Sequence, residues 1–302
     1  MSVRWKFKVL LKRIATALLS RKTNLVSDER YTAIIYRIIF GRRFDINCPH
    51  TYNEYLSVLK LNSNTAGYAP YADKYEVRKY VEKTIGGEYL NPLLGIYNTF
   101  KEINFTELPR KFALKCTHGS SYNIIVKNKD TLNLAAAERK ITRWLKQNYY
   151  YKMREKQYKN IRPRIMCDQY LCPVDESPLN EVKLYCINGI VRFIVDNHKK
   201  ENARYANLYD RAWNRLDVTY GFPRNDKYKS PENAQEIVSV AEKLAKPFEF
   251  VRVDLYNVDN KIIFSELTFC PGGGMVLFNP DSFDYEMGNY FALRRSAYDC
   301  TN

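Results

Sequence analysis

Two acidic residues in apolar surroundings give the first indication of chemistry in this sequence. Asp254 lies in VRVDLY and Glu266 in IFSELT, and the turn Asn257-Val258-Asp259-Asn260 separates the two runs. This pattern predicts a β-hairpin over residues 250–269. A carboxylate on a buried strand is unfavourable unless a cation neutralises it. Two such carboxylates across one hairpin predict a hard cation, most simply Mg²⁺, which in proteins usually also holds substrate phosphates.

A purely structural interpretation of the same acids stays open. Arg252 precedes Asp254 by two residues. Buried acids also occur in ion pairs that have no catalytic part, so Asp254 and Glu266 would then pair with Arg252 or with a lysine.

A phosphate-binding element is predicted within residues 111–127, KFALKCTHGSSYNIIVK. Two predicted strands, Phe112–Cys116 and Tyr122–Val126, flank the small residues Thr117–Ser121. The backbone N–H groups of such a tip can surround phosphate oxygens, and Lys115 would supply a point charge beside them. An ordinary hairpin with an exposed lysine is the alternative, because the loop has one glycine and matches no P-loop pattern.

The elements that position these residues are helices and strands in mixed order. Periodicity and caps predict helices at 4–22, within 27–65, at 73–85, 133–151 and 231–246. RIMCDQYL (164–171) predicts a buried strand, and EVKLYCI-NG-IVRFIV predicts a second hairpin with Lys183 in an apolar strand. Pro271–Gly274 predicts a flexible loop after the late hairpin.

The positive charge is concentrated in two stretches. The net charge is +15, and residues 1–22 hold seven Lys/Arg and no acid, while residues 138–164 hold ten Lys/Arg and two acids. Such patches favour an anionic partner: an acidic polysaccharide, an anionic lipid or nucleic acid. No nucleic-acid-binding motif accompanies them, so we expect no nucleic-acid partner.

The N-terminal stretch 4–22 has the pattern of a basic amphipathic helix that lies on an anionic membrane surface. A helix packed on its own domain with a solvated basic face is equally compatible. Seven scattered cysteines without metal spacing, together with the lack of a signal-peptide pattern or an apolar span, predict a cytoplasmic protein at or near the inner face of the membrane.

Five stretches together resemble a known family: LKCTHGSSYNIIV, YKNIRPRI, KLYCINGIVRFI, FVRVDLYNVDNKIIFSELTFCPGGG and FNP. Their order resembles the ATP-grasp superfamily and, more closely, the TupA-like ATP-grasp family, from about Tyr52 to about Gly288. The resemblance implies an α+β ATP-grasp fold in which two α+β lobes enclose ATP. The residues themselves predict a basic amphipathic helical region at 1–65. The resemblance implies an ATP-grasp domain at 66–302, with a phosphate-loop lobe at 66–165 and a lobe with hinge and metal-binding hairpin at 166–302.

The resemblance also implies roles for residues on the phosphate side. Lys115 is similar to the strand lysine that contacts ATP phosphates, and Lys183 to a further lysine beside them. The segment after Lys115 resembles the loop that closes over the triphosphate, and its residues are His118, Gly119, Ser120 and Ser121.

The end of the strand RIMCDQYL resembles the hinge that holds adenine. Gln169 and Leu171 would contact the base through backbone groups, with Tyr170 between them and Asp168 near the exocyclic amine. Asp175 is a candidate for ribose. The superfamily commonly has Glu where this chain has Asp168-Gln169, and this departure implies altered nucleotide contacts or reduced activity.

Asp254 and Glu266 resemble the Mg²⁺ ligands, and Arg252 resembles the residue facing the phosphoryl group or acyl phosphate. Thr268 stands where the superfamily commonly has an Asn ligand, which puts the third metal ligand in question.

The activity implied by the resemblance is ATP- and Mg²⁺-dependent joining of a carboxylate to an amine through an acyl phosphate. The TupA-like family is associated with teichuronopeptide and capsular or exopolysaccharide biosynthesis. The acceptor would be a uronic acid of an anionic glycan or of its lipid-linked precursor, and the amine an amino acid. Two alternatives are an ATP-grasp kinase of a glycan or small molecule, and a non-catalytic glycan- or membrane-binding protein that keeps the fold.

Overall fold

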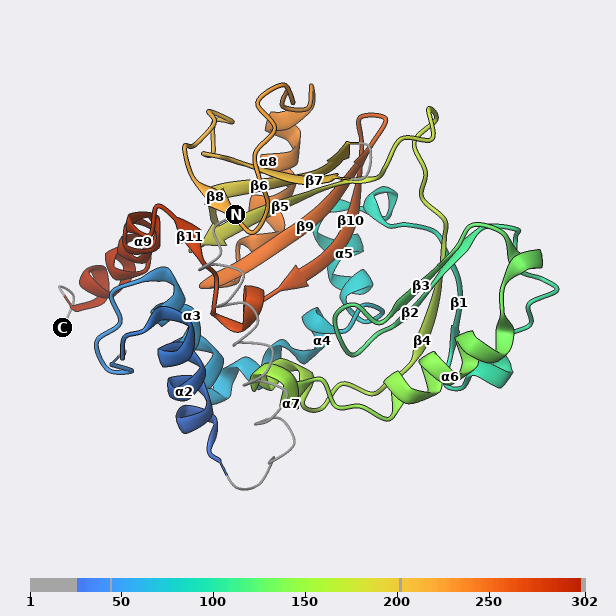
Figure 1. The fold of residues 1–302 in the computed structure, drawn as a ribbon, viewed down its shortest axis with the longest axis horizontal. Coiled ribbons are helices and arrows are strands. Elements are labelled where there is room, and N and C mark those ends of the chain that lie inside the picture. The colour runs from blue at the N-terminus through green and yellow to red at the C-terminus, as the bar shows by residue number, and fades with distance from the viewer. Residues whose placement is uncertain (1–25, 44, 201–202, 300–302) are drawn as a thin grey trace.

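The computed structural model describes residues 26–43, 45–200 and 203–299 and contains two antiparallel sheets (Figure 1). The first sheet has the order β1-β4-β2-β3, and the second has the order β10-β9-β5-β6-β7. Helices and antiparallel sheets together confirm the predicted α+β class. The first sheet consists of β1 (Leu93–Tyr97), β2 (Phe112–Cys116), β3 (Asn123–Val126) and β4 (Ile165–Gln169), and the second of β5 (Asn180–Ile187), β6 (Ile190–Lys200), β7 (Ala203–Tyr209), β9 (Phe250–Val258) and β10 (Lys261–Thr268); β8 (Thr219–Tyr220) pairs with β11 (Phe278–Asn279).

The helices surround these sheets, and most of those predicted in the described residues are present with shorter bounds. They are α2 (Asp28–Phe40), α3 (Tyr52–Leu61), α4 (Ala69–Ala72), α5 (Val77–Ile85), α6 (Leu134–Leu145), α7 (Tyr150–Met153), α8 (Ala234–Ala245) and α9 (Ser282–Asp299). Asp73 does not begin the helix predicted at 73–85; its carboxylate accepts the N–H groups of Tyr75 and Glu76, and α5 begins at Val77. The predicted helix at 4–22 lies outside the described residues.

Alternation along β2 places one face of the first sheet against α6 and the other toward the second sheet. Phe112, Leu114 and Cys116 are buried in one apolar cluster with Ala137 and Ile141 of α6. Because neighbouring strand residues point to opposite faces, the Lys115 side chain lies on the face away from α6.

The second sheet repeats this arrangement with α8 on its back. Val182 and Leu184 of β5 pack with Ile237, Ala241 and Leu244 of α8. Lys183 therefore points to the opposite face, the same face as Asp254, its cross-strand partner on β9.

The domain division expected from the sequence stays a prediction, although the sheets give one detail of it. Strand β4, which the division assigns to the second lobe, lies in the first sheet between β1 and β2. The chain passes from the first sheet to the second between Gln169 and Asn180.

Helix α3 holds the glycine-rich segment that follows β10. Thr51 and Glu54 form the predicted capping box at its start. The buried Asn53 amide donates to the Val276 carbonyl at 2.8 Å and to Asp284 Oδ1 at 2.8 Å, and its oxygen accepts the Val276 N–H at 2.7 Å. The end of the late hairpin is thereby fixed to a helix more than 200 residues earlier in the chain.

We expect the Asn53→Ala variant to lose about 2–4 kcal/mol of unfolding free energy, because it leaves several buried polar groups without partners. The exposed Asn64 provides the control, since Asn64→Ala should change stability by less than about 0.5 kcal/mol. Urea denaturation of both variants measures the difference, and equal midpoints would show that Asn53 does not hold the two segments together.

A buried acid lies on the back of the second sheet. Asp196 of β6 is fully buried and forms no ion pair within the part of the chain that the structure describes. Burial raises the pKa of Asp196 to about 7. An aspartate in an unfolded chain titrates near 4, so between about pH 4 and 7 the folded protein holds a proton that the unfolded chain has released. Stability therefore falls as pH rises through this window.

The Asp196→Asn variant should remove this dependence. We expect the unfolding free energy of the variant, relative to the natural protein, to rise by on the order of 2 kcal/mol between pH 5 and pH 8. Urea midpoints at the two pH values measure it, with the exposed Asp281→Asn as the control. A constant difference across the two pH values would contradict the assignment.

Candidate active site

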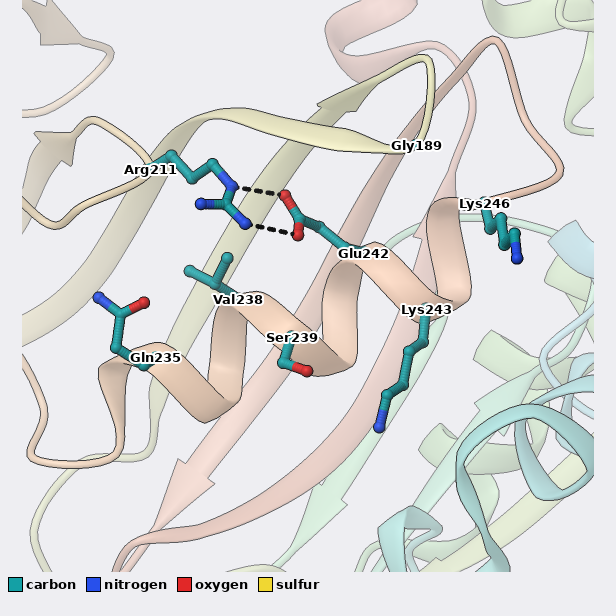
Figure 2. A pocket seen from close by; sticks show the side chains of 8 residues that line it. All are labelled: Gly189, Arg211, Gln235, Val238, Ser239, Glu242, Lys243 and Lys246. Atoms are coloured by element: carbon teal, nitrogen blue, oxygen red, sulfur yellow. Dashed lines mark hydrogen bonds and ion pairs between the residues drawn. The ribbon is translucent and has the colours of Figure 1, made fainter.

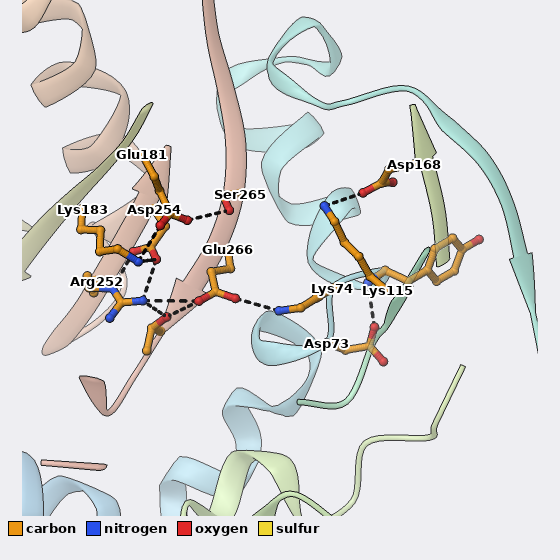
Figure 3. Close-up of polar contacts among 12 residues, drawn as sticks. Asp73, Lys74, Lys115, Asp168, Glu181, Lys183, Arg252, Asp254, Ser265 and Glu266 are labelled. Carbon is orange, nitrogen blue, oxygen red and sulfur yellow. Dashed lines mark hydrogen bonds and ion pairs between the residues drawn. The ribbon is translucent and has the colours of Figure 1, made fainter. Parts of the chain in front are cut away.

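A polar cleft of about 460 Å³ lies between the two sheets, and its walls come from elements far apart in the sequence (Figure 3). One wall is formed by the first sheet, the loop after β2 and the segment between α4 and α5. The other wall is formed by strands of the second sheet. The cations that line it are Lys74, Arg78, Lys115, Lys183 and Arg204, and the acids are Asp168, Glu181 and Glu266.

Asp254 lies beneath the second-sheet wall and is completely buried. Arg252 binds it through two contacts, Nε to Oδ1 at 2.6 Å and Nη2 to Oδ2 at 2.6 Å. Lys183 Nζ lies 3.1 Å from Oδ2 and 2.8 Å from Glu181 Oε2. This arrangement contains the ion pair that the structural interpretation of the sequence expected.

Glu266 stands beside this pair but reaches the cleft, with 26% of its side chain exposed. Lys74 Nζ contacts its Oε2 at 2.7 Å, and Arg252 Nη2 lies 3.3 Å from its Oε1. Thr268 bridges the two, since it accepts from Arg252 at 3.0 Å and donates to Glu266 at 3.1 Å. Thr268 thus orients Glu266 and Arg252 in this structure.

A β-bulge at Ser265 places Glu266 on the cleft side. The two-residue turn at Asp259 and Asn260 sets the register, with Phe264 opposite Leu255, but Glu266 rather than Ser265 then pairs with Asp254. In an unbroken ladder Glu266 would pair with Val253 and point toward the apolar back of the sheet. Ser265 and Glu266 both line the cleft instead.

The charged groups on this wall shift one another's pKa values. Burial would raise the pKa of Glu266, but Lys74 and Arg252 outweigh burial and hold that pKa well below its usual range. Burial and the neighbouring Asp254 carboxylate raise the pKa of Glu181. Glu266 is therefore an ionised, accessible oxygen donor, whereas Glu181 takes up a proton more readily.

The first-sheet wall contains a second ion pair. Lys115 Nζ contacts Asp168 Oδ2 at 2.8 Å, while the buried Asp168 Oδ1 has no hydrogen-bond partner among the described residues. Asn91 donates to the Gln169 carbonyl at 2.8 Å, and the Gln169 N–H donates to the Pro92 carbonyl. The orphan oxygen of Asp168 is a ready acceptor for a donor group that enters the cleft.

Part of the predicted phosphate loop lines the cleft, and part of it is turned away. Ser120 and Ser121, the latter with φ of 64°, line the cleft. His118 does not, because its ring is buried and Nε2 lies 3.0 Å from the Trp144 carbonyl of α6. Burial lowers the pKa of His118, so a neutral ring donates to that carbonyl. Gly119 has no room for a side chain, since an added Cβ would lie 2.8 Å from Tyr122 and Tyr149.

The predicted hinge residues also differ in whether they line the cleft. Leu171 lines the cleft. The Gln169 side chain is exposed, and the Tyr170 ring lies 5.9 Å from Lys111 Nζ. Asp175 is exposed in the following loop, accepts the Ser177 N–H, and does not line the cleft.

Sequence reasoning missed several cleft residues, among them the charged Lys74, Arg78, Glu181 and Arg204. Lys74 follows Asp73, and this polar pair next to a helix start was the signal available for it. Arg204 lies in a polar stretch that predicts no element, so nothing local marked it.

The residues on the second-sheet wall fit a hard divalent ion in donor type, because they supply carboxylate oxygens. Among the described residues no group of three or more His, Cys, Asp or Glu side chains is arranged for a metal. Glu266 reaches the cleft, whereas Arg252 and Lys183 cover Asp254. The set fits an ion shared with phosphates better than a cage made by protein alone.

A second hollow on α8 lies behind the second sheet and contains none of the predicted site residues (Figure 2). Its charged centre is a pair, with Arg211 Nε 2.8 Å and Nη2 2.9 Å from the Glu242 carboxylate, and Glu242 also accepts the Val191 N–H. These contacts fasten α8 to the β5–β6 hairpin and satisfy the charges locally.

The sequence matches the model of the family described as TupA-like ATPgrasp over residues 54–292. A search of curated proteins finds no match. Among solved structures, D-alanine–D-alanine ligase from Bacillus anthracis is 16% identical over 78% of this chain and 70% of the ligase, with a TM-score of 0.46. The ATP-grasp ligase PsnB, complexed with a phosphomimetic variant of its minimal precursor, Mg and ADP, is 14% identical over 72% of this chain and 58% of PsnB, with a TM-score of 0.39. Among the helices of the described residues, none has the length and apolar character of a membrane span.

We expect the two acids of the late hairpin to differ in their effect on stability. Asp254→Asn should cost about 3–5 kcal/mol, because it leaves buried Arg252 and Lys183 without their full counter-charge. Glu266→Gln should cost about 1 kcal/mol, since partly exposed ion pairs contribute little. Urea unfolding measures both, and a similar loss in the two variants would contradict the structural role of Asp254.

Proposed function

The chain belongs to the TupA-like ATP-grasp family, and from this premise we propose that it is an ATP-dependent carboxylate–amine ligase. Membership confirms the ATP-grasp fold expected from the sequence. The observation that carries the proposal is the cleft, where lysines from both sheets converge on one space beside accessible Glu266.

The proposed position of ATP follows from the two walls. Lys115, Ser120 and Ser121 lie on the first-sheet wall and suit the phosphates, with Lys74 and Lys183 facing them. Leu171 and the unpartnered Asp168 oxygen suit adenine and its exocyclic amine. In this proposal His118 supports the loop and does not contact ATP, because its ring is turned toward α6.

Mg²⁺, held by Glu266 together with ATP phosphates, would supply charge neutralisation for the transferring phosphoryl group. Asp254 is the second carboxylate beside it, and Thr268 orients Glu266. Since Lys74 already contacts Glu266, phosphates that draw Lys74 away would free a carboxylate oxygen.

The proposed reaction has two steps. A carboxylate oxygen of the acceptor attacks the γ-phosphorus in line, the bond to the β–γ bridging oxygen breaks, and ADP leaves. An amine then attacks the carbonyl carbon, phosphate leaves with the acyl bonding electrons, and the amine proton passes to solvent. Arg252, beside Glu266 and Thr268, stabilises the negative charge that develops.

The proposed acceptor is a uronic acid of a capsular or exopolysaccharide, or of its lipid-linked precursor, and the amine is an amino acid. Arg78 and Arg204 support an acidic acceptor, because both line the cleft and neither pairs with a carboxylate among the described residues. We place the reaction on the cytoplasmic side, where ATP is available.

The test is incubation of the protein with Mg-ATP, a glucuronic acid glycoside and a mixture of amino acids. We expect ADP, phosphate and an amide product in equal amounts by mass spectrometry and phosphate assay. Glu266→Gln should lower turnover by at least 100-fold, since it removes the accessible metal ligand. Lys243→Gln on the back of the second sheet is the control and should leave turnover unchanged.

Two outcomes would overturn the proposal. ADP with a phosphorylated sugar and no amide would identify a kinase. No thermal shift with Mg-ATP, in a folded protein, would identify a non-catalytic binding protein that keeps the fold.

A further inference from the structure

Helix α6 presents a strongly basic surface on the back of the first sheet. Arg139, Lys140, Arg143 and Lys146 are exposed. Arg139, Arg143 and Lys146 follow the spacing i, i+4 and i+7, which places them along one side of the helix over about 10 Å. A shallow groove of about 650 Å³ runs beside these three side chains.

These cations lack the partners that cations elsewhere in the protein have. Several arginines elsewhere among the described residues pair with acids, as Arg211 does with Glu242 and Arg215 with Asp226. Within the described residues, none of the four α6 cations forms an ion pair. Glu138 is the single acid lining the groove.

The chemistry of the groove favours a hydrated polyanion over a bilayer. The described residues that line it are all of polar or charged types, with Thr142 and Gln147 between the cations. A helix that binds a membrane surface needs apolar side chains on the buried face, and this groove has none. Hydroxyl and amide groups interleaved with cations suit the carboxylates and hydroxyls of an acidic sugar chain.

Residues at the end of α6, beside the groove, also contact the loop that lines the cleft. The Trp144 carbonyl of α6 holds His118, and the Tyr122 hydroxyl donates to Gln147 Oε1 at 2.7 Å. The Tyr122 ring stacks on Trp144 at 5.5 Å. A chain bound along α6 would therefore lie against the residues that fix Ser120 and Ser121.

We propose that the basic face of α6, defined by Arg139, Arg143 and Lys146, binds a segment of an acidic polysaccharide outside the catalytic cleft. The identity of this ligand rests on the proposed function, since the same class of glycan supplies the acceptor. The surface retains the polymer while single uronic acids enter the cleft.

The test measures binding of a polygalacturonic acid oligomer to the full chain by fluorescence anisotropy, without ATP. The triple variant Arg139→Gln/Arg143→Gln/Lys146→Gln should bind at least tenfold more weakly. A matched triple variant, Lys83→Gln/Lys243→Gln/Lys246→Gln, removes the same charge from exposed positions on α5, on α8 and directly after α8, and should bind like the natural protein. Binding should weaken with salt, because it releases counter-ions.

Two results would overturn the inference: equal binding by both triple variants, or binding of phosphatidylserine vesicles or duplex DNA as tight as that of the oligomer. Failure of the proposed function appears separately. Polymer binding that depends on α6, without any ligation, would support the binding surface and contradict the ligase activity. Ligation of a monomeric uronic acid without polymer binding would support the ligase activity and contradict the binding surface.

Discussion

The buried carboxylate of Asp254 is the constraint on which the site depends. It is satisfied by Arg252 from its own strand and by Lys183 from β5, so β5 and β9 must hold one register for the charge to be neutralised. The same guanidinium continues to Glu266 and Thr268 on β10. Because a buried charge without a partner costs several kcal/mol, folding of the second sheet and assembly of this wall are one event.

The lysines of the cleft are paired with acids of the protein itself. Lys74 contacts Glu266, Lys115 contacts Asp168, and Lys183 contacts Asp254. A polyphosphate that binds there exchanges internal ion pairs for new ones, and this exchange keeps the net gain per contact modest. In the proposed site, selectivity would arise from the arrangement of the lysines, which could contact several phosphate oxygens at once.

The sequence predicted what local pattern determines. The late hairpin, the strand with Lys115 and the Asn-Gly hairpin each have the period and turn residues of a strand pair, and their side-chain alternation is fixed by geometry. Contacts between distant segments were not predictable. Lys74 meets Glu266 across 192 residues, and His118 turns to α6 because Trp144 offers a carbonyl there. The bulge was equally hidden, since Ser265 differs in no obvious way from a regular strand residue.

That bulge lets β10 contain one extra residue without moving the Glu266 carboxylate away from Asp254. Phe264 lies on the face of the sheet that the hairpin turn sets for it. Glu266 and Thr268 lie on the face opposite to the one that an unbroken ladder of the same length would give them. Ser265 is the extra residue, so its loss would place Glu266 directly after Phe264 and opposite Asp254 in an unbroken ladder, on the same cleft side as in the bulged strand. The cleft position of Glu266 is therefore compatible with two lengths of this strand: one residue shorter without a bulge, or the present length with a bulge at Ser265.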